Sequence, residues 1–111
     1  MASDADLKNA LLEEASVGWI DLFDAIAVVK IVEGGEGRLL LLCRAGPLVV
    51  DLVREGRLIC GTWVEGGFER WRVTPHEAAD AVAEHVRRAS TGDLDPVPGE
   101  PCSFARGEVG E

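Results

Sequence analysis

The stretch GGFERWRVTPHEAADAV, residues 66–82, predicts a turn, a strand and a helix in direct succession. Its paired glycines favour a turn, and the aromatic and β-branched residues that follow favour a strand. Thr74 and Glu77 match a Thr-x-x-Glu capping box, and Pro75 takes the first helical position, where its missing N–H costs nothing. We therefore expect a hairpin strand that leads directly into a helix, whose apolar stripe consists of Ala78, Val82, Val86 and Ala89.

The residues before this stretch complete the hairpin. Residues 58–64 form an apolar run, and a turn at residues 65–67 joins it to a strand at residues 68–73. Because successive side chains of a strand point to opposite faces, Trp71 and Val73 are expected to face the core. Three side chains then remain free for a partner: Phe68, Arg70 and Arg72.

Two helices are predicted near the N-terminus. Ser3 is a candidate N-cap for the first helix, which Gly18 ends. Asp21 is a candidate N-cap for the second helix, although the run AIAVVKIV, residues 25–32, is rich in β-branched residues and also fits a strand. The run GGEG, residues 34–37, ends the second element in either case.

The segment RLLLLCRAGPLVVDLVREG, residues 38–56, allows two interpretations. It forms either two strands that divide at Gly46 and Pro47, or a helix that Gly56 terminates. The helix is preferred, and Pro47 then either opens it or kinks a longer helix that starts near Arg38. The predicted fold is therefore α+β, with three N-terminal helices, a β-hairpin and a C-terminal helix.

The length of 111 residues fits one domain. We assign this domain to residues 1–91, and residues 92–111 to an acidic tail rich in proline and glycine. The tail is expected to cross the surface, with Cys102 and Phe104 as candidate tethering residues.

The net charge of −9 is unevenly distributed along the chain. Residues 38–73 carry six arginines against four acids, whereas both ends are acidic. Such overall acidity disfavours a generic nucleic-acid binder, because phosphate neutralisation supplies much of that affinity. The apolar runs are too short to span a membrane and the acidic N-terminus does not resemble a leader, so a cytoplasmic location is expected.

Catalysis and metal binding are not predicted. His76 and His85 lie nine residues apart, on opposite sides of a continuous helix. No phosphate-binding glycine motif is present. The widely spaced cysteines do not match a disulfide framework or a zinc site, and each is expected to be a small buried residue: Cys43, Cys60 and Cys102. The protein is therefore expected to be non-enzymatic, with no cofactor and no metal.

Several short motifs resemble a family of small, uncharacterised actinobacterial proteins. They are GWIDLFD, LVREGRLICGTW, GGFERWRVTPHEAADAV and GDLDPVPGEPC, with G-F-x-x-W-x-x-x-P-x-E-A as the most distinctive pattern. Some members of that family look like immunity proteins, the companions of secreted toxins. The order of elements also resembles the winged helix-turn-helix, in which the third helix leads into the wing. Gly46 and Pro47 depart from that pattern, because they interrupt the segment that would be the recognition helix.

The first functional hypothesis is an acidic protein-binding module. The resemblance implies an immunity-type protein that docks on a basic toxin domain and neutralises it, and acidic flanks suit a basic partner. Trp19 and Trp63 are candidate anchors, although core packing is the preferred expectation for both. The candidate contact residues are Asp4, Asp6, Glu13, Glu14, Asp21 and Asp24.

The alternative hypothesis is a winged-helix DNA-binding transcriptional regulator. Against it, the hairpin tip is acidic at Glu65 and Glu69, and residues 38–55 offer no Asn, Gln, Ser or Thr to read base edges. The candidate DNA contacts are Arg54, Arg57, Arg70 and Arg72.

Overall fold

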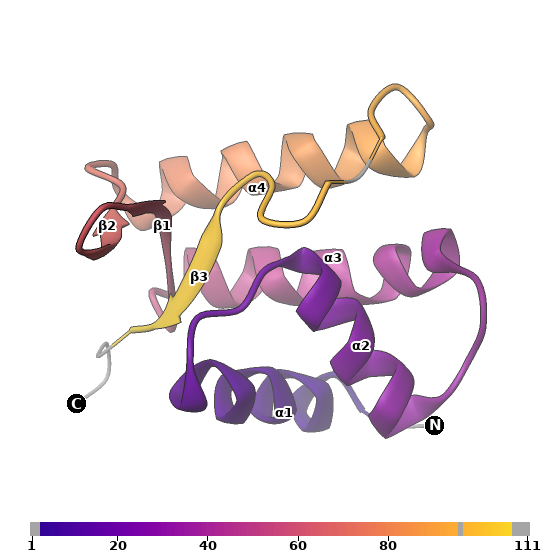
Figure 1. Ribbon diagram of the computed structural model, residues 1–111. Coiled ribbons are helices and arrows are strands. Elements are labelled where there is room, and N and C mark those ends of the chain that lie inside the picture. Colours follow the sequence, from indigo (N-terminus) through magenta and orange to yellow (C-terminus); the bar gives the residue numbers. More distant parts are fainter. Residues whose placement is uncertain (1–2, 96, 108–111) are drawn as a thin grey trace.

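The computed structural model describes residues 3–95 and 97–107 (Figure 1). Within these ranges the chain forms four helices and a three-stranded antiparallel sheet, which confirms the α+β class. The helices are α1 (Asp4–Val17), α2 (Leu22–Glu33), α3 (Arg38–Arg54) and α4 (Pro75–Ser90). The strands are β1 (Leu58–Val64), β2 (Gly67–Arg70) and β3 (Ser103–Arg106), in the order β2-β1-β3.

Three of the helices begin with the capping residues that the sequence predicts. The Ser3 and Asp21 side chains accept hydrogen bonds from backbone N–H groups of the first turns of α1 and α2. At α4, the Thr74 hydroxyl oxygen accepts from the Glu77 N–H, and the Glu77 carboxylate accepts from the Thr74 N–H, both at 3.1 Å. These bonds satisfy N–H groups that have no partner within the helix.

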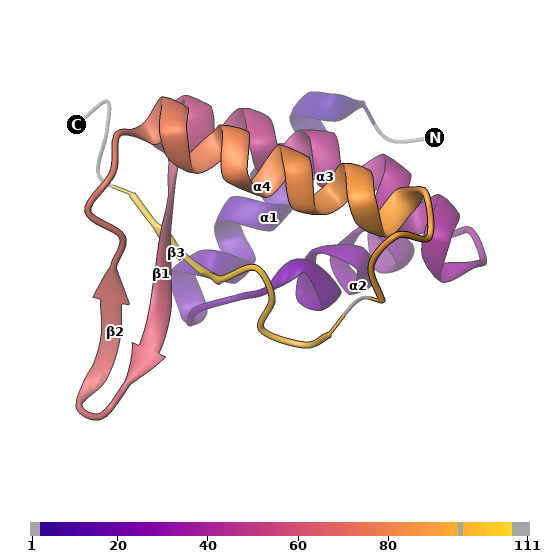
Figure 2. The same cartoon turned by 90° about the horizontal axis from the view of Figure 1, so that it is seen from above.

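The segment at residues 38–54 is one helix, so the interpretation as two strands is wrong, as is the strand alternative for α2. Pro47 lies inside α3 on its exposed side and does not open the helix. The neighbouring Gly46 has a packing role at the contact between α3 and α4. A Cβ atom at Gly46 would lie 2.5 Å from Val86 Cγ1, so glycine permits the close approach of α4 to α3 (Figure 2).

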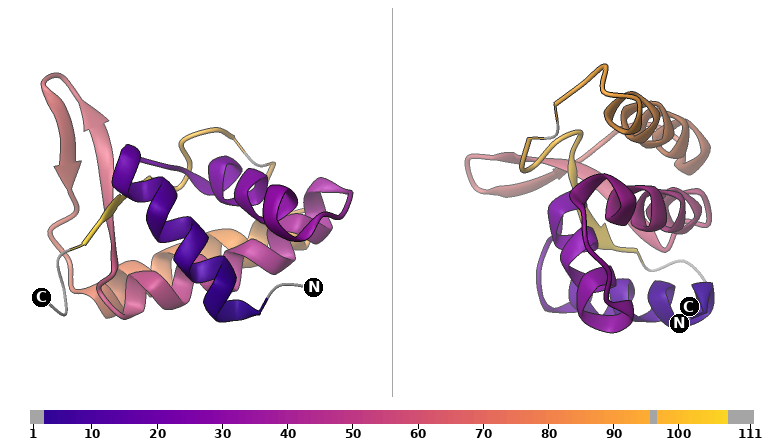
Figure 3. Two further views of the ribbon diagram at one scale, coloured as in Figure 1. Left: turned by 90° about the horizontal axis from the view of Figure 1, so that it is seen from below. Right: turned by 90° about the vertical axis from the view of Figure 1, so that its right-hand side faces the viewer.

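Helix α3 occupies the middle of the molecule. Helix α4 covers one side, and α1 and α2 lie on the other side (Figures 1 and 3). Between Leu41 and Val53, only Cys43 and Pro47 are exposed. The periodic leucines and valines of this segment therefore form the centre of the hydrophobic core.

The hairpin agrees with the prediction in position and differs in length. A tight turn at Glu65 and Gly66 joins the strands, but β2 ends at Arg70, three residues before the predicted end. Trp71 still donates its backbone N–H to the Cys60 carbonyl, at 2.9 Å, before the chain departs for α4. Trp71 packs against the core as expected, whereas Val73 is 43% exposed because the strand has already ended.

The third strand was not predicted. The segment expected to be a surface tail returns to the sheet, where β3 pairs with β1 and Phe104 is fully buried. The N–H and C=O groups of Phe104 also bond to Ile20, at 2.7 and 3.0 Å, which ties the α1–α2 connection to the sheet. Cys102 is buried as well, so both candidate tethering residues lie in the core; residues 96 and 108–111 of the tail lie outside the described residues.

The three cysteines differ in burial. Cys60 and Cys102 are buried as predicted, but Cys43 is exposed, because the side of α3 that carries it faces solvent.

In residues 3–95 and 97–107, no helix is both long and apolar enough to cross a membrane.

Candidate binding surface and cavity at the hairpin

Three aromatic side chains gather on the outer face of the sheet. The ring centroids of Trp19 and Trp63 are 4.3 Å apart in an edge-to-face arrangement, and those of Trp19 and Phe68 are 5.1 Å apart. Phe68 lies directly over Gly61, where a Cβ atom would collide with its ring. We call Trp19, Trp63 and Phe68 the aromatic face.

Backbone register explains why these residues meet. Trp63 of β1 lies opposite Phe68 of β2, so both side chains point to the same side of the sheet. Ile20 points inward and is buried, which leaves the preceding Trp19 on the outer side. The hairpin projects beyond the helices, so no other element of the described chain covers this side (Figures 2 and 3).

The exposure of the aromatic face contradicts the preferred expectation that both tryptophans belong to the core. Trp63 is 62% exposed and Trp19 is 38% exposed. One sequence signal was available for Trp63. It follows Leu58 by an odd number of residues, so the two point to opposite faces of the same strand, and Leu58 is buried.

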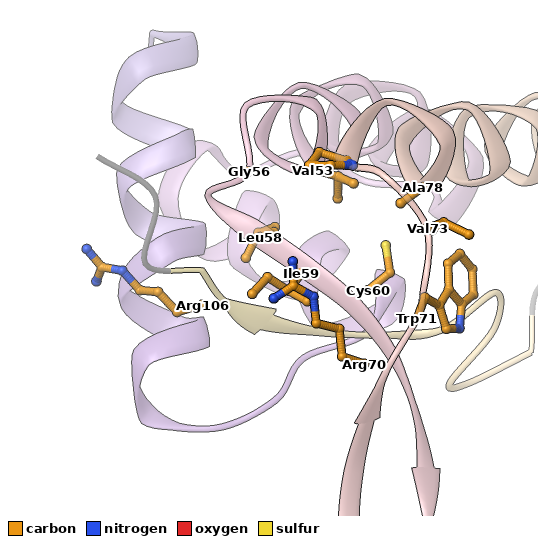
Figure 4. A pocket seen from close by; sticks show the side chains of 11 residues that line it. Val53, Gly56, Leu58, Ile59, Cys60, Arg70, Trp71, Val73, Ala78 and Arg106 are labelled. Atoms are coloured by element: carbon orange, nitrogen blue, oxygen red, sulfur yellow. The ribbon is translucent and has the colours of Figure 1, made fainter. Parts of the chain in front are cut away.

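A cavity of about 470 Å³ lies at the base of the hairpin, where β1 meets the end of α3 and the start of α4 (Figure 4). It opens here because β2 pairs with β1 only from Gly61 to Val64 and leaves the start of β1 uncovered on that side. The lining residues are Val53, Gly56, Leu58, Ile59, Cys60, Arg70, Trp71, Val73, Pro75, Ala78 and Arg106.

The polar groups around this cavity are few. The Trp71 indole N–H donates to the Thr62 hydroxyl oxygen at 3.1 Å, which fixes the ring beside the cavity. Arg106 donates to the Ser16 hydroxyl oxygen at 2.6 Å and thereby turns its guanidinium toward α1. Figure 4 shows the Arg70 guanidinium beside Ile59, on the other side of β1 from Trp71 and Val73.

Four of the six predicted acidic contact residues have roles within the fold. Asp6 accepts from the Ser3 N–H, and Asp4 forms an ion pair with Arg44 at 2.6 Å. Asp21 accepts from the N–H groups of Asp24 and Gly99, both at 2.9 Å, and Asp24 accepts from the Asp21 N–H at 3.0 Å. Within the described chain, neither of the remaining two forms an ion pair or a side-chain hydrogen bond: Glu13 and Glu14.

The structure brings part of this acidic set together. Burial raises the pKa of Asp24, and the neighbouring carboxylates of Asp21 and Glu14 act in the same direction. These three residues surround the α1–α2 connection that carries Trp19, whereas Asp4 and Asp6 lie at the other end of α1.

The four predicted DNA-contact arginines divide into two pairs. Arg54 lies 4.0 Å from Asp51 and 3.6 Å from Asp80, and Arg57 lies 3.6 Å from Glu55. Arg70 and Arg72, by contrast, are exposed and form no ion pair with any carboxylate in the described chain.

The histidines and cysteines, which are the remaining candidates for a catalytic or metal site, do not lie together in one site. His76 is exposed near Asp80, while partial burial lowers the pKa of His85. A hydrogen bond with Cys60, together with burial, raises the pKa of the Cys102 thiol, which favours the unreactive protonated form. Among residues 3–95 and 97–107, no group of three or more histidine, cysteine or acidic side chains is arranged to hold a metal ion.

Comparison of the chain with protein-family models, with curated proteins and with solved structures gives no match.

Proposed function

We propose that the protein is a non-enzymatic protein-binding module that contacts its partner through the aromatic face. The observation that carries this proposal is the exposure of Trp19 and Trp63 on a hairpin that projects from the helical body. Tryptophan side chains in such positions are the residues that most often dominate the binding energy of protein interfaces. Trp63 is 62% exposed and does not belong to the buried core cluster.

The charge around the aromatic face favours a basic partner. The whole chain has a net charge of −9, and Glu14, Asp21 and Asp24 border the connection that carries Trp19. Complementary charge accelerates association and disfavours partners of the same sign. In addition, the faces of exposed tryptophan rings attract lysine and arginine side chains.

A basic toxin domain is the specific partner that we propose. This step rests on the sequence resemblance to small actinobacterial proteins, some of which look like immunity proteins. An immunity protein acts by occupying its toxin and needs no catalytic residues of its own. The separated histidines and the two buried thiols, those of Cys60 and Cys102, fit that mode of action.

DNA binding by a winged-helix mechanism has less support. The arrangement of three helices and a hairpin is compatible with a winged-helix-like fold, but β3 comes from the C-terminal segment, and α4 lies along α3. A recognition helix needs an exposed polar face in the major groove. Along α3, nine of the thirteen residues from Leu41 to Val53 are buried, and the two polar side chains of this segment, Arg44 and Asp51, form ion pairs within the chain. Of the four predicted DNA-contact arginines, Arg70 and Arg72 are the two that form no ion pair within the described residues.

Affinity capture from the native cell tests the proposal. The wild-type chain and two exposed-residue variants are compared: Trp63→Ser on the aromatic face, and Ile31→Ser on α2 as a matched control, since Ile31 is 84% exposed. We expect one small basic protein to co-purify with the wild type and with Ile31→Ser, and to be lost with Trp63→Ser. Equal capture by both variants, or no retained protein, would contradict the proposal.

Two further measurements sharpen the result. Glu14→Lys tests the acidic border without disturbing a helix cap, whereas Asp21→Lys and Asp24→Lys would also remove the capping box of α2. Retention of duplex DNA at about physiological salt tests the alternative, because a specific DNA-binding protein stays bound under those conditions.

A further inference from the structure

Strand β2 forms a free edge of the sheet. The strand order is β2-β1-β3, so β2 has a hydrogen-bonded neighbour on one side only. The edge at β3 differs, because the backbone of Phe104 also bonds to Ile20. A free strand edge presents unpaired N–H and C=O groups, which are a template for pairing with another strand.

Strand register shows which backbone groups of β2 point outward. In an antiparallel pair, residues that bond to the neighbouring strand alternate with residues whose N–H and C=O groups point away from it. The Trp71 N–H bonds to the Cys60 carbonyl at 2.9 Å, so the odd-numbered residues of β2 bond to β1. The backbone groups of Phe68 and Arg70 therefore point away from β1. Within the described residues, no backbone group outside the β1–β2 pair bonds to them.

The side chains on the outer face leave this edge open. The Phe68 ring lies over Gly61 of β1, and the Arg70 guanidinium lies beside Ile59 of β1 (Figure 4). Both side chains thus lean over the sheet and away from its edge. In Figure 2 the hairpin projects beyond the helices, and β2 forms the margin of the molecule there. Another strand can therefore approach β2 along its length.

The charges of β2 select one register for pairing with a second copy of the same strand. Three antiparallel registers bring the outward-pointing backbone groups together: Phe68 opposite Arg70, Arg70 opposite Arg70, or Phe68 opposite Phe68. The first places Glu69 opposite its own counterpart, and the second does the same with Arg70. Like charges in directly opposite positions destabilise a strand pair. The third register avoids this, because it places Glu69 opposite Gly67.

In the third register the hairpin is complementary to itself in charge. Its tip carries Glu65, whereas Arg70 lies toward its base, and antiparallel pairing sets the tip of each copy beside the base of the other. Arg70 then lies opposite Gly66 of the second copy, next to Glu65 of that copy, and its exposed side chain can turn to reach the carboxylate. Two-fold symmetry makes each contact occur twice.

We propose that two copies of this chain pair through the edges of β2, with Phe68 opposite Phe68 at the two-fold axis, to form a six-stranded antiparallel sheet. Because each hairpin projects from its helices, the two helical bodies lie at opposite ends of this sheet (Figure 3). Opposite residues share a side of the sheet, so the two aromatic faces join on one side. The dimer is argued from β2 alone and stands whether or not the aromatic face binds a toxin.

Sedimentation equilibrium and amide hydrogen exchange test the dimer with the wild-type chain. From about 1 μM to about 1 mM, the sedimentation data are expected to show a monomer–dimer equilibrium of modest affinity. Over the same range, the Phe68 N–H is expected to gain protection from hydrogen exchange, because it becomes bonded in the dimer. The Glu69 N–H is the internal reference, since it bonds to β1 in the monomer as well.

Two charge reversals test the register. Glu65→Arg places arginines at both ends of the contact, and Arg70→Glu places acids at both, so each variant alone is expected to dimerise at least about tenfold more weakly than the wild type. Mixing the two variants restores opposite charges at both contacts, so a heterodimer is expected. With only Glu65→Arg isotope-labelled, this heterodimer appears as protection of its Phe68 N–H. Glu13→Arg makes the same charge change on exposed α1 and is expected to dimerise like the wild type.

Four results would each overturn the proposal. They are a monomer throughout the concentration range, concentration-dependent protection elsewhere with none at Phe68, charge-reversed variants that dimerise as strongly as the wild type, and a mixture of these variants that forms no heterodimer. Glu65 and Arg70 are exposed, and well-dispersed NMR spectra of each variant verify that the fold is kept.

Discussion

The two faces of strand β1 differ sharply in what covers them. On the inner face, Leu58 and Cys60 are buried beneath α3 and α4, together with Phe104 from the neighbouring strand. On the outer face, Trp63 is exposed and contacts other aromatic rings of the hairpin and of the α1–α2 connection. Trp63 is therefore exposed only three residues after the buried Cys60.

This difference between the two faces of β1 suggests that the inner face stabilises the fold and that the outer face serves binding. The inner face involves segments that are distant in sequence. Phe104 of β3 lies opposite Cys60 of β1, and its backbone also bonds to Ile20. The outer face joins only Trp19 to the hairpin. We therefore expect substitutions on the inner face to reduce the free energy of unfolding, and substitutions on the outer face to change binding.

The largest effect is expected from Phe104→Ala on the inner face. Phe104 is fully buried, and its removal leaves a cavity between the sheet and the helices, so the free energy of unfolding should fall by about 3–5 kcal/mol. Chemical denaturation followed by far-ultraviolet circular dichroism measures the change. A loss below about 1 kcal/mol would show that β3 is not part of the stable core.

The next largest effect is expected from Gly46→Ala, behind the inner face. The new methyl group would lie 2.5 Å from Val86 Cγ1, so α4 must shift or Val86 must repack, at a cost of about 1–3 kcal/mol. The same denaturation measurement applies. Gly18→Ala is the control, because Gly18 has an extended backbone and nothing within 4 Å of the added atom.

A double variant tests the mechanism of the Gly46→Ala effect. If the methyl group collides with Val86, combining Gly46→Ala with Val86→Ala should cost less than the sum of the two single changes. Additive costs would place the strain elsewhere in α3.

Local signals in the sequence predict most of the elements of this fold. Capping residues such as Thr74 and Asp21, and terminating glycines such as Gly18 and Gly56, act within one or two turns, so they are readable without a structure. Strand β3 has no such signal. Its four residues, SFAR, become a strand because they pair with a segment more than forty positions earlier in the chain.

The candidate sites were less predictable for the same reason. The aromatic face combines Trp19 with a hairpin that begins some forty residues later, and periodicity cannot reveal which helix connection will pass beside it. The cavity depends on where β2 ends, and Trp71 continues to bond to Cys60 beyond that point. Aromatic residues are usual in cores, so composition alone favoured burial of Trp63.

A smaller effect on stability is expected from Trp63→Ala on the outer face. The change removes a ring contact with Trp19 and a cross-strand neighbour of Phe68, at a cost of about 1 kcal/mol or less. The comparison with Phe104→Ala in the same denaturation series tests the separation of the two faces. Equal losses for the two variants would mean that the aromatic face is a second core and is not reserved for a partner.

The smallest effect on the free energy of unfolding is expected from Glu77, in the first turn of α4 after the hairpin, and it depends on pH. The N–H of Thr74 holds the pKa of the Glu77 carboxyl below its ordinary value. Because the folded state favours the ionised form, this carboxylate stabilises the fold above the ordinary glutamate pKa of about 4.3, and the contribution is lost as the pH falls through and below that value. Glu77→Gln keeps the reciprocal capping bonds but cannot titrate, so its stability should fall less than that of the wild type between about pH 5 and pH 3. Denaturant midpoints measured across this range give the comparison, and parallel curves for the two proteins would show that Glu77 carries no part of the acid sensitivity.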